Sequence, residues 1–161
     1  MALFLDNYCK NAINMSDFMK SMEIQLSDLL HTKDHGIIKG ISNIFLNRLK
    51  ELDIYERPIH CTDAKRLTMY VKDNNEWLEG DKSKQKISDT IQNISALQIK
   101  KIPNWEEEYI HKLNKEDLDD EYMKIVNSTS KFVGEKEEEK IIRNIAKDVT
   151  INKKSLEISD S

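Results

Sequence analysis

The chain is poor in glycine and proline, with four glycines and two prolines in 161 residues. Sandwiches and barrels need a turn roughly every eight to twelve residues, and turns draw heavily on these two residue types. Their scarcity disfavours an all-β fold and leaves helix as the default. The sequence also lacks a run of about 18 uncharged apolar residues and the basic, then apolar start of a signal peptide. We therefore expect no membrane span, no secretion and an intracellular protein.

Cysteine is scarce as well, because Cys9 and Cys61 are the only two. Two cysteines so far apart are typical of plain thiols in a reducing compartment rather than of a disulfide framework. The sequence has no paired-cysteine zinc motif, no Gly-rich phosphate loop, no Gly-x-Ser-x-Gly elbow and no dinucleotide fingerprint. From the residues alone we expect a protein that is not an enzyme, with no cofactor and no metal.

Two histidine patterns invite a functional interpretation. His31 and His35 are four residues apart, as in zinc metalloproteases, but that motif needs a glutamate where Thr32 stands, and Gly36 ends or bends the helix. His60 and Cys61 form a candidate base and nucleophile. Adjacent residues of a strand point to opposite faces, so His60 cannot activate Cys61 directly. We expect a half-buried thiol and a surface or interface imidazole.

Charge is abundant, at 34% of residues, and its balance differs along the chain. Residues 48–101 hold 11 Lys and Arg against 9 Asp and Glu, a net charge of +2. Residues 104–161 hold 10 against 15, a net charge of −5. Neither part has the clear basic excess that a nucleic-acid-binding module usually shows.

Apolar spacing of three and four predicts several helices. The helices are expected at residues 16–31, at 37 to about 53, at 87 to about 100, from Pro103 through Leu113, around 118–126, and at 141–149. Pro103 is expected to open a new helix, because proline suits the first helical turn.

From Pro58 the pattern changes to alternation, and residues 59–63, 67–72 and 76–79 favour short strands. Asn74 and Asn75 suit a tight hairpin turn. The predicted fold is α+β, mostly helical, with a small antiparallel sheet near residues 59–79. The expected organisation is an N-terminal lead-in (1–15), a helix–helix–hairpin–helix core (16–102), an acidic helical C-terminal part (103–151) and a flexible tail (152–161).

Basic and aromatic side chains gather on and around this hairpin. The candidate binding surface consists of Arg57, Lys65, Arg66, Tyr70, Lys72 and Trp77. A basic hairpin after two helices is the order found in winged-helix-like modules, whose wing contacts phosphates. An ordinary solvated hairpin is the competing interpretation, since carboxylates interrupt the patch.

An assembly role is the second functional hypothesis. Methionine side chains adapt readily to a partner surface, and several stand close together near the N-terminus. The contact surface for a homo-oligomer or virion component would comprise Met15, Phe18, Met19 and Met22.

The stretches RPIHCTD at 57–63, YVKD at 70–73 and KKIPNW at 100–105, with Lys65, Arg66 and Trp77, resemble an uncharacterised domain of giant viruses. The chain is similar to the C-terminal part of mimivirus-like proteins of nucleocytoplasmic large DNA viruses. Residues 122–126 and 141–147 fit the same pattern, so the likeness covers roughly residues 15–151.

This resemblance implies a viral protein of the host cytoplasm or virion, without an assigned activity. Some relatives carry an upstream Cys-Cys-His-His zinc finger, but no cysteine pair precedes Ser16 here, so a DNA-binding role through a finger is not implied. The leading hypothesis is a non-enzymatic interaction protein that docks nucleic acid, or a viral or host protein, through the hairpin.

Overall fold

The computed structural model describes residues 2–151, which form a mostly helical α+β fold. The helices are α1 (Ala2–Tyr8), α2 (Met15–Lys20), α3 (Leu26–His35), α4 (Ile37–Lys50), the 3-10 helix η1 (Ile54–Glu56), α5 (Gly80–Tyr109), α6 (Lys115–Thr129) and α7 (Glu135–Val149). The strands are β1 (Ile59–Asp63), β2 (Thr68–Asp73) and β3 (Glu76–Leu78). The predicted fold class is therefore confirmed, whereas the predicted flexible tail (152–161) lies outside the described residues.

The described chain divides into two compact units, and α4, α5 and α7 contribute residues to both. Unit 1 comprises residues 2–22, 46–90 and 142–151, and unit 2 comprises 23–45 and 91–141. Each unit is assembled from segments that are distant in the sequence. No helix within residues 2–151 combines the length and the apolar character needed to cross a bilayer.

The sheet of unit 1 has the strand order β1-β2-β3, and both strand pairs are antiparallel. Asn74 and Asn75 adopt φ values of 49° and 63°, so they supply the left-handed conformation that the tight turn between β2 and β3 requires. The hairpin predicted at residues 59–79 is therefore confirmed together with its turn. An irregularity in register between Cys61 and Asp63 was not predicted.

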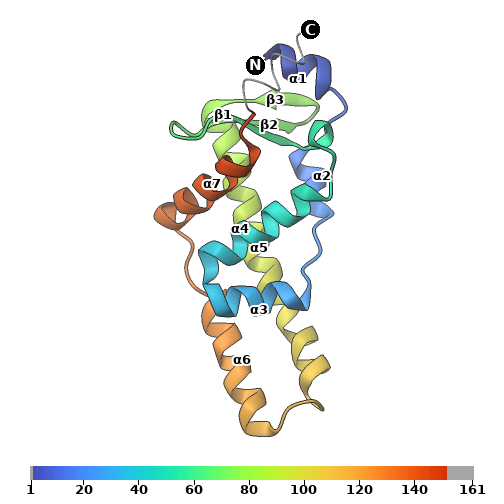
Figure 1. The fold of residues 1–161 in the computed structure, drawn as a ribbon. Helices are drawn as coiled ribbons and strands as arrows, with labels where there is room; N and C mark the ends of the chain where they lie inside the picture. Colours follow the sequence, from blue (N-terminus) through green and yellow to red (C-terminus); the bar gives the residue numbers. More distant parts are fainter. Residues whose placement is uncertain (1, 152–161) are drawn as a thin grey trace. The chain divides into compact units, whose positions relative to one another are not determined.

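The two faces of this sheet are covered differently. One face carries His60, Tyr70 and Trp77, and the apolar residues of α1 pack against it. Figure 1 shows α1 lying along this side of the sheet. The opposite face carries the fully buried apolar residues of β1 and β2, namely Ile59, Cys61, Met69 and Val71. The sheet is thus buried on both faces.

Helix α1 is a finding that the sequence analysis missed, since it predicted no helix before residue 16. Phe4 and Leu5 are buried, and they join Cys9, Ala12 and Ile151 in one apolar cluster. A helix of seven residues is marginal in water by itself, so its stability comes from this packing against the sheet.

The helix predicted at residues 16–31 is wrong, because two helices, α2 and α3, occupy this stretch. The break is stabilised by a capping box at Gln25: the carboxylate of Asp28 accepts a hydrogen bond of 2.8 Å from the main-chain N–H of Gln25. Met22 and Ile24 in the connection are buried, and so are Met15 and Phe18. The methionine surface expected for assembly is therefore largely interior.

The break predicted at Pro103 is also wrong, because α5 continues through it to Tyr109. Proline removes one helical hydrogen bond and costs about 3 kcal/mol in a helix interior. The buried positions of α5 nevertheless keep their helical spacing on both sides of Pro103, at Ile87, Ile91, Ile94, Gln98, Ile102 and Trp105. Burial of this continuous stripe outweighs the local cost.

Unit 2 joins α3, α6 and the second half of α5, and Figure 1 shows α3 passing across the other two helices. The hydroxyl of Thr32 donates a 2.6 Å hydrogen bond to Oε1 of Gln98, and both side chains are completely buried. A Cβ atom on Gly40 of α4 would lie 2.0 Å from Oγ1 of Thr32. The glycine therefore permits the close approach of α3 and α4.

Candidate functional site

The predicted binding surface on the hairpin is largely built into the fold of unit 1. Tyr70 and Trp77 are partly buried against the apolar cluster of α1. Lys72 is 6% exposed, and its Nζ donates to the main-chain oxygens of Lys10 at 2.9 Å and of Ala12 at 2.7 Å. These three side chains thus hold the N-terminal segment on the sheet.

Of the other three residues of that surface, one is built into the fold and two are exposed. Arg57 is partly buried, and its Nε donates to the main-chain oxygens of Leu49 and Leu52 at 3.1 and 3.3 Å, where α4 ends. Lys65 and Arg66 are exposed in the loop between β1 and β2, and Nε of Arg66 lies 3.8 Å from a carboxylate oxygen of Asp63. Of the six candidates, Lys65 and Arg66 alone present exposed charge.

The expectation of a surface or interface imidazole at His60 is wrong, because α1 covers the face of the sheet on which it lies. His60 is 1% exposed, and its Nε2 lies 3.6 Å from Sγ of Cys9. Burial, reinforced by the positive charge of Arg57, lowers the pKa of His60 to about 4. Burial raises the pKa of the Cys9 thiol to about 11. Both groups are therefore neutral at neutral pH.

Cys61 is completely buried, whereas a half-buried thiol was expected. In the sheet it pairs with Met69 of β2, next to the pair of His60 and Tyr70. Burial raises the pKa of its thiol, while a hydrogen bond with Thr150 opposes this shift. The two thiols are free. The prediction that His60 and Cys61 do not act on each other agrees with their places on alternate faces of β1.

The histidine pair of α3 is the remaining candidate ligand set. The ring centroids of His31 and His35 are 4.4 Å apart, near the C-terminal end of this helix at His35. No group of three His, Cys, Asp or Glu side chains within residues 2–151 could hold a metal ion.

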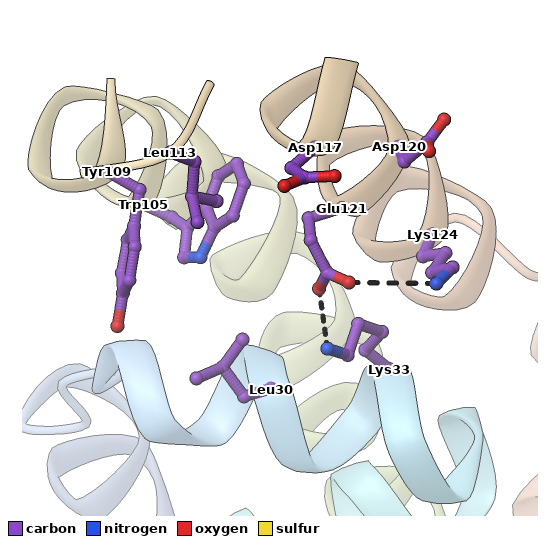
Figure 2. Close-up of a pocket in the computed structure, with 9 residues that line it drawn as sticks. All are labelled: Leu30, Lys33, Trp105, Tyr109, Leu113, Asp117, Asp120, Glu121 and Lys124. Atoms are coloured by element: carbon purple, nitrogen blue, oxygen red, sulfur yellow. Dashed lines mark hydrogen bonds and ion pairs between the residues drawn. The ribbon is translucent and has the colours of Figure 1, made fainter. Parts of the chain in front are cut away.

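Unit 2 contains a pocket of about 450 Å³, which we call the Trp105 pocket. It lies among α3, the C-terminal end of α5 and the first turns of α6 (Figure 2). Its lining residues are Leu30, Lys33, Trp105, Tyr109, Leu113, Asp117, Asp120, Glu121 and Lys124. This volume falls within the range of ligand-binding clefts.

One wall of the Trp105 pocket is aromatic and apolar. Trp105 and Tyr109, one helical turn apart on α5, stack with ring centroids 5.3 Å apart at 22°. Leu113, another turn along the chain, extends this wall, and Leu30 of α3 faces it across the pocket (Figure 2). Trp105 is 1% exposed, and its Nε1 has no hydrogen-bond partner.

The other wall is acidic and comes from α6. Glu121 is compensated, because Nζ of Lys33 lies 2.6 Å from one of its carboxylate oxygens and Nζ of Lys124 lies 3.6 Å from the other. The hydrogen bond from Lys33 lowers the pKa of Glu121 and raises that of Lys33. Asp117 accepts a hydrogen bond of 3.0 Å from the side-chain amide of Asn114, which carries no charge. Asp117 lies in the first turn of α6, which favours a negative charge, and it forms no ion pair with any of residues 2–151.

Trp105, Tyr109 and Leu113 fall in the helix predicted from Pro103 through Leu113, whereas the carboxylates around residues 117–120 were not predicted to belong to a site. The spacing of the aromatic residues was the available signal. The opposing residues of α3 and α6 could not be paired with them without the tertiary structure. No protein-family model, curated protein or solved structure matches this chain.

Proposed function

We propose that this chain is a non-enzymatic interaction protein that binds a protein partner through unit 2. The observation that carries the proposal is the Trp105 pocket, which combines an apolar aromatic wall with an acidic one. Binding sites are typically concave and largely apolar, with a few polar groups that fix orientation. The proposal keeps the interaction role expected from the sequence and moves it from the hairpin to the Trp105 pocket.

Charge favours a protein partner over nucleic acid. Unit 2 holds 10 Lys and Arg against 15 Asp and Glu, a net charge of −5. A polyanion would be repelled by such a surface. On the hairpin, Arg57 and Lys72 donate hydrogen bonds to main-chain oxygens. Of the six candidate residues, only Lys65 and Arg66 could therefore contact a phosphate with an exposed charge.

Exposed apolar side chains support the same conclusion. Within the described residues, four large hydrophobic side chains of unit 2 are strongly exposed: Ile99, Ile110, Met123 and Phe132. Phe132 is 83% exposed. Aromatic and methionine side chains are enriched at surfaces that contact other proteins. A second copy of the chain is the alternative partner, and it corresponds to the assembly hypothesis.

The resemblance of residues 57–63 and 100–105 to the giant-virus domain extends the proposal to a viral setting. The partner would then be a viral or host protein met in the host cytoplasm or the virion. This extension depends on the resemblance alone.

The proposal is tested by panning a displayed library of random peptides against the full chain. Leu113→Trp fills the Trp105 pocket at a partly buried position, and Ile110→Trp adds the same ring at an exposed neighbouring position as the matched control. We expect enriched peptides that bind the Ile110→Trp variant like the wild type and the Leu113→Trp variant at least tenfold more weakly. Absence of enriched peptides, or equal binding to the two variants, would contradict the proposal.

Two further measurements separate the alternatives. A gel-shift titration across salt concentrations should show no salt-dependent complex with DNA or RNA. A complex that Lys65→Glu with Arg66→Glu abolishes would return the function to the hairpin. Light scattering of the wild type and of Phe132→Ser should give a monomer mass for both, and a dimer that only the wild type forms would support assembly.

A further inference from the structure

The indole N–H of Trp105 is a buried hydrogen-bond donor without an acceptor. Its Nε1 has no hydrogen-bond partner, although only 1% of the residue is exposed. Buried donors are nearly always paired, and an unpaired one destabilises a fold. Figure 2 shows this nitrogen on the edge of the ring that faces Leu30, at the Trp105 pocket. Because the nitrogen itself is buried, a ligand oxygen could accept its hydrogen bond only after a neighbouring side chain of the pocket moves.

Leu30 is the labelled side chain that this donor faces in Figure 2. It lines the pocket on α3 and is only partly buried, so its side chain can change rotamer at small cost. Once Leu30 turns aside, an acceptor of an entering chain can reach Nε1. Leu30 and Leu113 then offer apolar surface to an aliphatic stem.

The charge of the pocket selects a cation. Lys33 and Lys124 both form ion pairs with Glu121, and neither forms one with Asp117. Asp117 is held by the neutral amide of Asn114. An incoming ammonium or guanidinium group would find this carboxylate without a competing cation, and it would add a charge-assisted hydrogen bond.

The rim of the pocket already shows such a contact within the chain. Nζ of Lys112 lies 5.3 Å from the centroid of the Tyr109 ring and 2.6 Å from a carboxylate oxygen of Glu108. An ammonium group is thus held there by an aromatic face and a carboxylate together. The lining of the pocket likewise contains an aromatic ring, that of Tyr109, and a carboxylate, that of Asp117.

We propose that the Trp105 pocket receives a lysine or arginine side chain of an extended partner segment. The cationic group pairs with Asp117, the aliphatic stem lies against Leu113 and Leu30, and a main-chain carbonyl of the segment accepts the hydrogen bond from Nε1 of Trp105. This inference rests on the proposed function and names the chemistry of its partner.

The test uses the full chain and three acetylated and amidated pentapeptides, which carry lysine, norleucine or glutamate between pairs of alanines. Norleucine keeps the aliphatic stem and removes the charge. Binding is followed by the indole N–H signal of Trp105 in ¹⁵N-labelled protein, with Trp77→Phe leaving a single indole to observe. We expect the lysine peptide to shift this signal and to bind at least fivefold more tightly than the norleucine peptide.

Asp117→Asn should weaken binding of the lysine peptide about fivefold, whereas Asp119→Asn, on the same helix but outside the pocket lining, should leave it unchanged. Equal binding of the lysine and norleucine peptides, or equal affinity of the two variants, would overturn the assignment of a basic side chain. Such a result would leave the proposed function standing if panned peptides still depend on the pocket. Peptide binding that leaves the Trp105 signal unmoved would overturn the role of the indole.

Discussion

Sγ of Cys9 lies 3.6 Å from Nε2 of His60, so the segment after α1 contacts the first strand of the sheet at a buried, uncharged pair. The imidazole also lies in edge contact with Phe4 and beside Trp77, with ring centroids 5.9 and 5.8 Å away. This environment suits the neutral imidazole and disfavours its protonated form. Protonation of His60 is therefore coupled to the docking of the N-terminal segment.

Stability should fall as the pH is lowered from about 6.5 to about 4. The ordinary pKa of histidine, 6.5, applies to the unfolded chain, and the fold lowers the pKa of His60 to about 4. As the pH falls, the unfolded chain therefore binds a proton at His60 before the folded chain does. Stability from this group is complete above pH 6.5 and decreases by about 3 kcal/mol as pH approaches 4. Urea unfolding at a series of pH values measures the decrease.

His60→Gln is the comparison variant, because it keeps a neutral polar side chain that does not titrate. Its stability profile should be flatter than that of the wild type between pH 6.5 and 4, whereas His35→Gln, at an exposed position, should retain the wild-type slope. A His60→Gln profile with the wild-type slope would contradict the assignment.

Both thiols should react slowly in the folded protein. Burial raises the pKa of Cys9 to about 11 and that of Cys61 above its ordinary value, so little thiolate is present at pH 8. A chromogenic disulfide reagent should therefore release little colour from the native protein and report two thiols in urea. Cys9→Ala and Cys61→Ala variants show which thiol reacts, and rapid native reaction of either would contradict its buried, protonated state.

Lys72→Met should detach the N-terminal segment. The substitution keeps the aliphatic stem but removes the donor to Lys10 and Ala12, which leaves two carbonyls with one partner fewer. We expect a loss of about 1–3 kcal/mol in the free energy of unfolding. Hydrogen exchange in residues 2–12 should accelerate.

Lys65→Met is the matched control for this variant, because Lys65 is exposed in the loop of the same sheet. Its effect should stay within about 0.5 kcal/mol. Equal destabilisation by the two variants would mean that the hydrogen bonds of Lys72 contribute nothing.

Gly40→Ala should destabilise unit 2 although alanine favours helix. The added Cβ would meet Oγ1 and Cβ of Thr32 at 2.0 and 2.8 Å, and Thr32 is fixed by its bond to Gln98. Overpacking of this kind costs about 1–3 kcal/mol and exceeds the helix gain of at most about 1 kcal/mol. Gly134→Ala is the control, since the atoms nearest to its Cβ would belong to the exposed ring of Phe132. A stabilised Gly40→Ala variant would contradict the tight approach.

Local patterns predicted the elements whose structure depends on neighbours in the sequence. Alternation gave the strands of residues 59–79, and the two asparagines gave the turn between β2 and β3. The helices α4, α6 and α7 followed from apolar spacing. In these elements, the local preference of the sequence agrees with the final fold.

The remaining features depend on contacts between distant residues. Phe4 and Leu5 carry little periodicity, and their burial is decided by a sheet face formed more than fifty residues later. For the same reason Lys72 and Trp77, which the observed register places opposite each other in β2 and β3, could not be recognised as covered. The Trp105 pocket needs three helices to close, so the sequence offered only its aromatic wall.

The main chain of residues 150–151 runs beside β1: Cys61 forms a parallel bridge with Thr150, and its carbonyl accepts a 2.9 Å hydrogen bond from Ile151. Unpaired strand edges act as templates for intermolecular β-pairing and fibre growth. Here the molecule occupies part of one edge with its own backbone, and the opposite edge is only the three residues of β3. Removing residues from 150 onward should therefore make the protein more prone to aggregate through β1.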